Sequence, residues 1–311
     1  MRERRHATPD GEGRYGRDIV LLGNDAPSDL RRQLTRVERA APQGHEPLIA
    51  SDEEGGSVQR LDSVIRPLPS AETMGNWPVA KLQRVAAKYG RGMAQLGVLM
   101  SLAPVADLRV PGSYMKQTIW GDPSGPVRAM WARTSWRGAR GLCRESGVAP
   151  VVKHWPGHGH ARDTHQFAAR VRDPRPTEER ADMVPFEDAF AAGVPAVMVA
   201  HVQSRGLTPN GVPATQSRKA ISVLRGQAGP DTVIITDSLS IGGGIVRAGA
   251  DRGPGHRRLL ACRCRLGDDL LDRSDRSRQG RQARDRPRNA RSGSTAAVLR
   301  SHQGAEGLAD L

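Results

Sequence analysis

Residues 148–165 read VAPVVKHWPGHGHARDTH, and this stretch changes character after its fifth residue. The apolar residues 148–152 predict a short buried strand, and the polar, glycine-containing residues that follow predict a loop. A buried strand that ends in such a loop is typical of a scaffold that carries functional side chains to the mouth of a site. We therefore expect the chemistry of this protein in the loop from Lys153 to His165.

The same unit of strand, loop and helix recurs along the chain. Five other strands are predicted near residues 19, 48, 98, 196 and 232, and helices are predicted over residues 26–41, 79–96, 126–146 and 177–192. This alternation predicts a parallel sheet with right-handed crossovers. Polar residues at successive strand ends favour a (β/α)8 TIM-barrel-like α/β fold, with an open doubly wound sheet as the alternative. Because only six strands can be identified, we expect the barrel to be incomplete or irregular at both ends.

The two ends of the chain differ from its middle. Residues 1–17 are polar and rich in Arg and Gly, which predicts disorder, whereas residues 18–250 carry the alternating pattern. Residues 251–311 contain fourteen arginines and eight acidic residues without a sustained helical or strand period. We interpret them as an atypical tail, either a disordered basic segment or the product of a shifted reading frame. Residues 294–300 could form a short helix within it.

The composition restricts the class of protein. The net charge is +14, but much of the excess is arginine in the tail, and with 4% aromatic residues and no binding motif a nucleic-acid partner is not expected. Three cysteines cannot build a disulfide framework and indicate a reducing compartment. No apolar stretch reaches the ~18 residues of a membrane span, and the first residues lack the apolar core of a signal peptide. We expect a cytoplasmic monomer that is not attached to a membrane.

The four histidines of the loop allow two interpretations. His154, His158, His160 and His165 could be taken for zinc ligands, but His-Glu-x-x-His spacing is absent and no cysteine lies near. Alternatively, Asp163 holds one ring nitrogen of His165 and leaves the other for proton transfer. We favour the second interpretation and expect neither a metal nor another cofactor.

Four segments share a further pattern when they are taken together and in order. They are SDEEGGSVQR at 51–60, KHWPGHGH followed by DTH at 153–165, PF through VMVAH at 185–201, and IITDSLS at 234–240. This series resembles glycoside hydrolase family 3, in its β-N-acetylhexosaminidase branch, over about residues 18–250. The resemblance implies a barrel enzyme that acts on carbohydrate, removing terminal N-acetylglucosamine from substrates such as peptidoglycan fragments.

The resemblance also implies which residues are catalytic. Asp237, at the end of a predicted strand, matches the family's nucleophile, and His165 with its partner Asp163 matches the acid/base pair of a double displacement that retains the anomeric configuration. Imidazole titrates near neutral pH, so it can donate a proton and then accept one. An aspartate in the position of Asp237 could instead cap the next helix.

The same resemblance implies which residues bind the sugar. They are Asp52 and Arg60 in the segment 51–60, and Lys153 and His154 in the segment 153–165. A carboxylate accepts hydrogen bonds from hydroxyl groups, and Lys or Arg donates to hydroxyl and acetamido oxygens. Arg60 could instead belong to an ordinary surface ion pair. The chain departs from the family at residues 115–120, MKQTIW, where the usual arginine is missing. A truncated, catalytically inactive relative therefore remains an alternative, with a basic nucleic-acid-binding protein behind it.

Overall fold

The computed structural model describes residues 19–42, 46–108, 145–159, 161, 164, 171–176, 181–238 and 299–300. Within these residues the main feature is a parallel sheet of seven strands, in the order β10-β8-β6-β5-β2-β1-β11. The strands are β1 (Ile19–Leu21), β2 (Leu48–Ser51), β5 (Met100–Ser101), β6 (Ala149–Trp155), β8 (Ala196–Val199), β10 (Val233–Thr236) and β11 (Leu299–Arg300).

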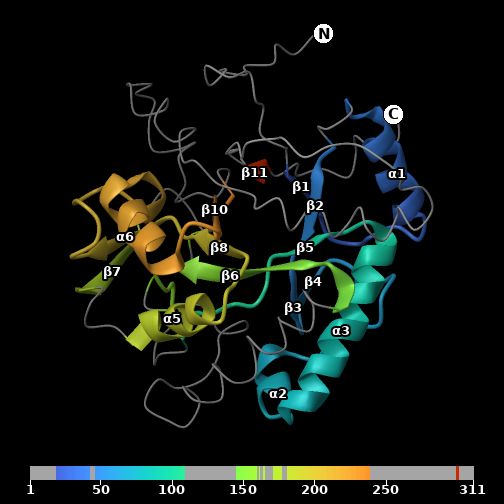
Figure 1. Cartoon of the computed structure of the whole chain (residues 1–311), viewed down its shortest axis with the longest axis horizontal. Coiled ribbons are helices and arrows are strands. Elements are labelled where there is room, and N and C mark those ends of the chain that lie inside the picture. The colour runs from blue at the N-terminus through green and yellow to red at the C-terminus, as the bar shows by residue number, and fades with distance from the viewer. Residues whose placement is uncertain are drawn as a thin grey trace, which may run out of the picture.

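All six strands predicted from the sequence occur, and each is the sheet neighbour of the next one along the chain. A doubly wound sheet reverses its order at a switch point, whereas a barrel adds each strand beside the previous one. The observed order is that of a barrel, and Figure 1 shows the sheet curling so that β2 and β6 run in different directions. The fold is therefore α/β and TIM-barrel-like, and among the described residues the sheet ends at β10 and β11 without closing.

The edge of the sheet at β1 is covered by a segment from the far end of the chain. Residues 299 and 300 form β11, whose parallel register pairs Ile19 with Leu299 and Val20 with Arg300. The prediction of a short helix over residues 294–300 is wrong for residues 299 and 300. An uncovered edge strand leaves backbone N–H and C=O groups without partners, and pairing with β11 satisfies part of that edge.

Strand β6 extends three residues beyond its predicted end at residue 152. The segment that follows β5 runs alongside it, with Val151 N donating to Ala103 O (3.0 Å), Lys153 N to Pro104 O (3.1 Å) and Ala106 N to Lys153 O (2.5 Å). Lys153 and His154 therefore lie in a buried strand, and their assignment to a loop was wrong. The chemistry-bearing side chains gain a more rigid support than a loop would provide.

The helices agree with the prediction in place and differ at their ends. Helix α3 (Val79–Leu96) has the predicted bounds and ends at Gly97. The φ of Gly97 is 92°, a left-handed conformation that glycine adopts without strain. Helix α1 (Leu30–Ala40) begins four residues late, and α5 (Val184–Ala191) follows a 3₁₀ turn, η2 (Ala181–Met183). Most of the predicted helix 126–146 lies outside the described residues.

Further elements are α2 (Ala71–Gly75), α6 (Arg218–Ala228), η3 (Ala214–Gln216), the hairpin of β3 (Glu53–Gly55) with β4 (Val58–Gln59), and the parallel pair of β7 (Val171–Pro176) with β9 (Val202–Arg205).

The core consists mainly of aliphatic side chains from the strands. One cluster joins the strands to α5 and α6 and contains Trp155 and Phe186, both fully buried. A second cluster packs α1 and α3 against the sheet, with Leu34, Ile49 and Met93 as members. No helix among the described residues combines the length and the apolar character that crossing a membrane requires. The packed helices and strands hold the carboxyl ends of the central strands in fixed positions.

Candidate functional site

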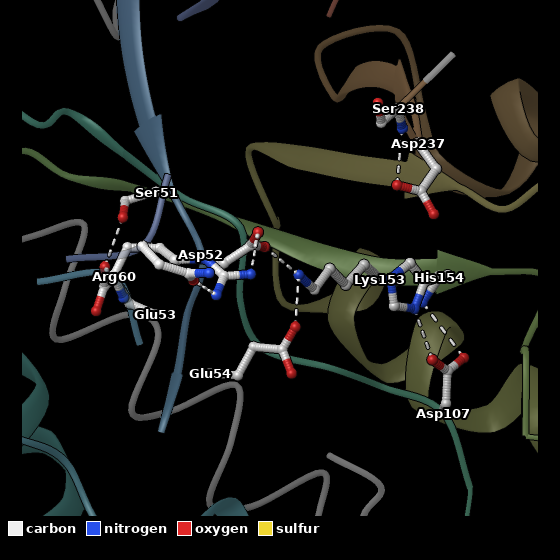
Figure 2. Close-up of polar contacts among 11 residues, drawn as sticks. Ser51, Asp52, Glu53, Glu54, Arg60, Asp107, Lys153, His154, Asp237 and Ser238 are labelled. Carbon is white, nitrogen blue, oxygen red and sulfur yellow. Dashed lines mark hydrogen bonds and ion pairs between the residues drawn. The ribbon is translucent and has the colours of Figure 1, made fainter. Parts of the chain in front are cut away.

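Lys153 links two strands of the sheet through two carboxylates. Its Nζ atom lies 2.6 Å from Asp52 Oδ1 and 2.8 Å from Glu54 Oε1, as Figure 2 shows. The Lys153 side chain is 4% exposed, that of Glu54 10% and that of Asp52 17%. These three charges are therefore largely removed from water, where an ion pair is stabilising only if every partner is in place.

The hairpin that follows β2 determines which acidic side chains face Lys153. Successive residues of a strand point to opposite sides, so Asp52 and Glu54 share one side and Glu53 takes the other. On that side Glu53 Oε1 accepts hydrogen bonds from Ser51 Oγ (2.5 Å) and from the Arg60 backbone N–H (3.2 Å). Glu53 Oε2 accepts a bond from the hydroxyl of Tyr89, in α3, at 2.5 Å.

The turn of this hairpin requires its two glycines. Gly55 has a φ of 90° and Gly56 a φ of 64°, and a Cβ atom on Gly55 would overlap the carbonyl oxygen of Pro69. Only glycine adopts such a conformation without strain while another backbone segment lies so close. The local structure thus accounts for the motif SDEEGGSVQR. Its acidic side chains point alternately to the two sides of the strand, and its glycines form the turn of the hairpin.

Arg60 lies at the outer side of the same cluster. Its Nη2 is 3.6 Å from Asp52 Oδ2, and its Nη1 donates to the side-chain oxygen of Asn24, which follows β1. Arg60 and Lys153 therefore contact different oxygens of the Asp52 carboxylate, and the interpretation of Arg60 as part of an isolated surface ion pair is not supported. Residues that follow β1 and β2 thus meet Lys153, which lies in β6 on the far side of β5.

The pKa values follow from these contacts. Burial alone would raise the pKa of Asp52, but the Lys153 ammonium and its hydrogen bond, together with Arg60, hold it below the usual range. Burial would lower the pKa of Lys153, yet Asp52 and Glu54 raise it above the usual value. The pKa of Glu53 is raised, because its burial outweighs the hydrogen bonds from Ser51 and Tyr89. Asp52 and Lys153 are therefore charged at neutral pH.

A second buried pair joins His154 to Asp107, the residue that follows the irregular strand segment after β5. His154 Nδ1 lies 2.7 Å from Asp107 Oδ2, and Asp107 Oδ1 accepts the backbone N–H groups of His154 (3.3 Å) and His158 (2.7 Å). The pKa of Asp107 is lowered although burial opposes this, because His154 lies beside it. Asp107 thus holds both the ring and the backbone of the segment that carries it.

Asp107, His154 and His158 also form the group that most resembles a metal site among the described residues. Their potential ligand atoms all lie within 4.8 Å of one another. However, the 2.7 Å separation of His154 Nδ1 from Asp107 Oδ2 is that of a charge-assisted hydrogen bond, and the Asp107 oxygens already accept three donors. We therefore interpret the three residues as a hydrogen-bonded cluster.

Asp237 follows β10 and faces the same region from the other side of β6 (Figure 2). Its backbone N–H donates to Val199 O (2.9 Å), and its Oδ1 accepts the N–H of Ser238 (2.8 Å). The pKa of His154 is raised by the carboxylate of Asp107 first and by that of Asp237 to a smaller extent. His201, after β8, lies 3.0 Å through Nε2 from Ser238 O and 2.9 Å through Nδ1 from Thr215 Oγ1, so it supports the chain next to Asp237.

The structure thus brings together five of the seven residues singled out in the sequence, namely Asp52, Arg60, Lys153, His154 and Asp237 (Figure 2). His165 and Asp163 lie outside the described residues. Asp107 and His201, which had no predicted role, belong to the same region and each follows a strand end, and Glu54 joins them from within β3. The rule that polar residues after parallel strands share one edge could have indicated them.

Comparison with known proteins identifies the family of this chain. The family model described as "Glycosyl hydrolase family 3 N terminal domain" matches residues 21–259. Beta-hexosaminidase LpqI of Mycobacterium tuberculosis is 35% identical over 230 residues, which cover 71% of this chain and 58% of that protein. The chain thus spans less than two thirds of that relative's length.

Two other proteins match more of their own length. Beta-hexosaminidase of Xanthomonas oryzae pv. oryzae is 33% identical over 273 residues, covering 82% of this chain and 77% of that protein. The crystal structure of beta-N-acetylhexosaminidase from Beutenbergia cavernae superposes with a TM-score of 0.67 at 25% identity, covering 83% of this chain and 80% of that one. On the family match and the shared fold, this chain belongs to glycosyl hydrolase family 3.

Proposed function

We propose that the chain is a retaining exo-β-N-acetylglucosaminidase that removes terminal N-acetylglucosamine from glycosides such as peptidoglycan fragments. The observation that carries this proposal is the position of Asp237 near His154, beside the cluster of Lys153, Asp52 and Arg60 at one end of the sheet. A nucleophilic carboxylate beside the bound sugar is one of the two groups that retaining glycoside cleavage requires, the other being an acid for the leaving oxygen. The names of the relatives, beta-hexosaminidase and beta-N-acetylhexosaminidase, support the same sugar class.

In this proposal Asp237 is the nucleophile. Its backbone is anchored to Val199 O and its Oδ1 to Ser238 N, so we assign the attack on the anomeric carbon to Oδ2. Attack breaks the glycosidic bond and forms a glycosyl-enzyme ester, which water then cleaves. Two inversions at the same carbon retain the anomeric configuration.

His165 is the proposed acid and base, with Asp163 as its partner. His165 protonates the leaving oxygen in the first step and takes a proton from water in the second. An imidazole in this role avoids placing a second carboxylate beside Asp237, whose charge would repel it. These two assignments rest on the DTH motif at residues 163–165.

The sugar is proposed to bind Asp52, Arg60, Lys153 and His154. A lysine ammonium has three N–H donors, and two of those of Lys153 are directed at Asp52 and Glu54. The third remains for a sugar hydroxyl. Asp52 can accept a hydrogen bond from a sugar hydroxyl while Lys153 and Arg60 keep its carboxylate ionised. The ligand atoms are therefore oriented by one another before substrate arrives.

Turnover of p-nitrophenyl β-N-acetylglucosaminide by the full chain tests this proposal. We expect release of nitrophenol, and proton NMR should show the β-anomer as the first sugar product. Asp237→Asn should lower kcat by roughly 10³-fold or more, because the covalent step is lost. His165→Ala should lower it strongly as well.

The matched control is Asp231→Asn, an exposed aspartate two residues before β10, at the opposite end of the same strand. Its turnover should equal that of the unmodified chain. A sample that unfolds cooperatively on heating but hydrolyses neither this substrate nor the β-glucoside would support the inactive relative instead. First formation of the α-anomer would exclude the retaining mechanism.

A further inference from the structure

The carboxylate of Asp107 is fully buried, and its two oxygens make different contacts. Oδ1 accepts two backbone N–H groups, those of His154 and His158, and Oδ2 faces the ring nitrogen Nδ1 of His154. The backbone contacts lock the carboxylate in place, because rotating it would leave two buried N–H groups without an acceptor. The second oxygen is therefore directed at the imidazole in one orientation.

The imidazole of His154 is held by packing as well as by Asp107. The ring of His158 lies against it edge to face, with centroids 5.7 Å apart and an interplanar angle of 70°. The His154 residue is 7% exposed and sits in β6, beside Lys153. With Nδ1 held by Asp107, the opposite nitrogen Nε2 is the atom that the ring can present to a ligand.

We propose that Asp107 is a positioning residue for His154, in that its carboxylate keeps a proton on Nδ1 and directs Nε2 towards the sugar. The inference rests on the proposed function only in naming a sugar as the ligand. The arrangement parallels the buried aspartate that fixes the tautomer of a catalytic histidine in serine proteases. Here the histidine is proposed to bind the substrate.

The charges around the ring act in the same direction. Burial lowers the pKa of His154, and so does Lys153, but the carboxylates of Asp107 and Asp237 outweigh them and raise it. The imidazole therefore retains a positive charge to a higher pH than a histidine in water. Asp107 on one side and Asp237 on the other provide the compensating negative charges.

Replacement of Asp107 by asparagine tests the inference, because the two backbone N–H groups determine how the amide is oriented. They require an acceptor at the Oδ1 position, so the amide oxygen takes that place and the NH₂ group faces Nδ1 of His154. Nδ1 must then accept a hydrogen bond, and the proton of the neutral ring moves to Nε2. A size-preserving change thus reverses the tautomer.

Ring-nitrogen NMR of the full chain, labelled with ¹⁵N-histidine and assigned by comparison with His154→Gln, measures this directly. In the unmodified chain Nδ1 of His154 should carry a proton, and in Asp107→Asn it should not. Glu53→Gln, the same acid-to-amide change at another buried carboxyl, should leave the His154 signals unchanged. An unprotonated Nδ1 in the unmodified chain would overturn the inference even if the Asp107 variant fails to fold.

Kinetics supply the second measurement. A purely structural role for Asp107 would reduce the active fraction and hence the apparent kcat, with KM unchanged. A misdirected His154 should instead raise KM and lower kcat/KM by roughly 10- to 100-fold, the range expected for one hydrogen bond to a charged group. Unaltered KM with unaltered ring signals in a folded Asp107→Asn variant would also overturn the inference. If the unmodified chain hydrolyses no substrate, the proposed function fails, and the NMR result still decides the tautomer.

Discussion

Lys153 Nζ lies 2.6 Å from Asp52 Oδ1, although 101 residues separate the two along the chain. Strand β5 lies between the strands that carry them, so the ion pair spans the central part of the sheet. Glu54, from the hairpin after β2, is the second anion on the same ammonium, at 2.8 Å. Because all three side chains are largely buried, the removal of one leaves charges that water cannot compensate.

We therefore expect Lys153→Met to lower the free energy of unfolding by roughly 3–5 kcal/mol, as well as to abolish activity. Methionine keeps much of the volume but leaves Asp52 and Glu54 facing each other. Urea denaturation measures the loss. The double variant Lys153→Met with Glu54→Gln should lose less than the sum of the two single changes, since one of the uncompensated charges is removed. Additive losses would show that the three charges do not act together.

Tyr89→Phe should destabilise the fold without touching the site directly. The Tyr89 hydroxyl donates to Glu53 Oε2, and its loss leaves a buried carboxyl oxygen with one donor fewer. The expected decrease in the free energy of unfolding is about 1–3 kcal/mol, measured in urea. Lys88→Gln, at the exposed preceding position of α3, is the matched control and should change it by less than about 0.5 kcal/mol. Equal stability of both variants would contradict the Glu53 network.

Two glycines should respond in opposite ways to alanine. A Cβ atom at Gly159 would overlap the carbonyl oxygen of Leu108, which adjoins Asp107, whereas Gly226 in α6 has open space around it. Gly159→Ala should therefore displace one of the two segments, lowering kcat/KM and destabilising by roughly 1–3 kcal/mol. Gly226→Ala should stabilise by about 0.5–1 kcal/mol, because alanine is the better helix former. Thermal melts and turnover measurements on both variants decide this.

The lowered pKa of Asp52 predicts a dependence of stability on acid. The folded chain binds a proton at Asp52 more weakly than the unfolded chain does, so ionised Asp52 stabilises the fold above its unfolded pKa of about 3.9. That contribution is lost as the pH falls through the lower, folded value. The difference in free energy of unfolding between the unmodified chain and Asp52→Asn should therefore shrink as the pH is lowered from 6 to 3. A constant difference across this range would contradict the assigned ionisation.

The pattern of residues was enough to predict six strands of the main sheet, whereas it left their order open between a barrel and a doubly wound sheet. Each apolar run followed by a polar residue became a strand of the sheet, and Asp52, Lys153 and Asp237 were recognised from their positions after such runs together with their motifs. Strand ends were less predictable. The extension of β6 through Lys153 depends on hydrogen bonds to residues 103–106, which lie about 50 positions away.

Local sequence thus determined that the chain is an α/β protein with polar and charged residues after its parallel strands, because strand periodicity and turn residues act over a few positions. Tertiary structure alone decided that Lys153 neutralises two acids, that Asp107 holds His154, and that residues 299–300 pair with β1. These are contacts between segments distant in sequence, set by how the sheet curls and which charges must be compensated on burial. A single sequence contains the partners but not their distances.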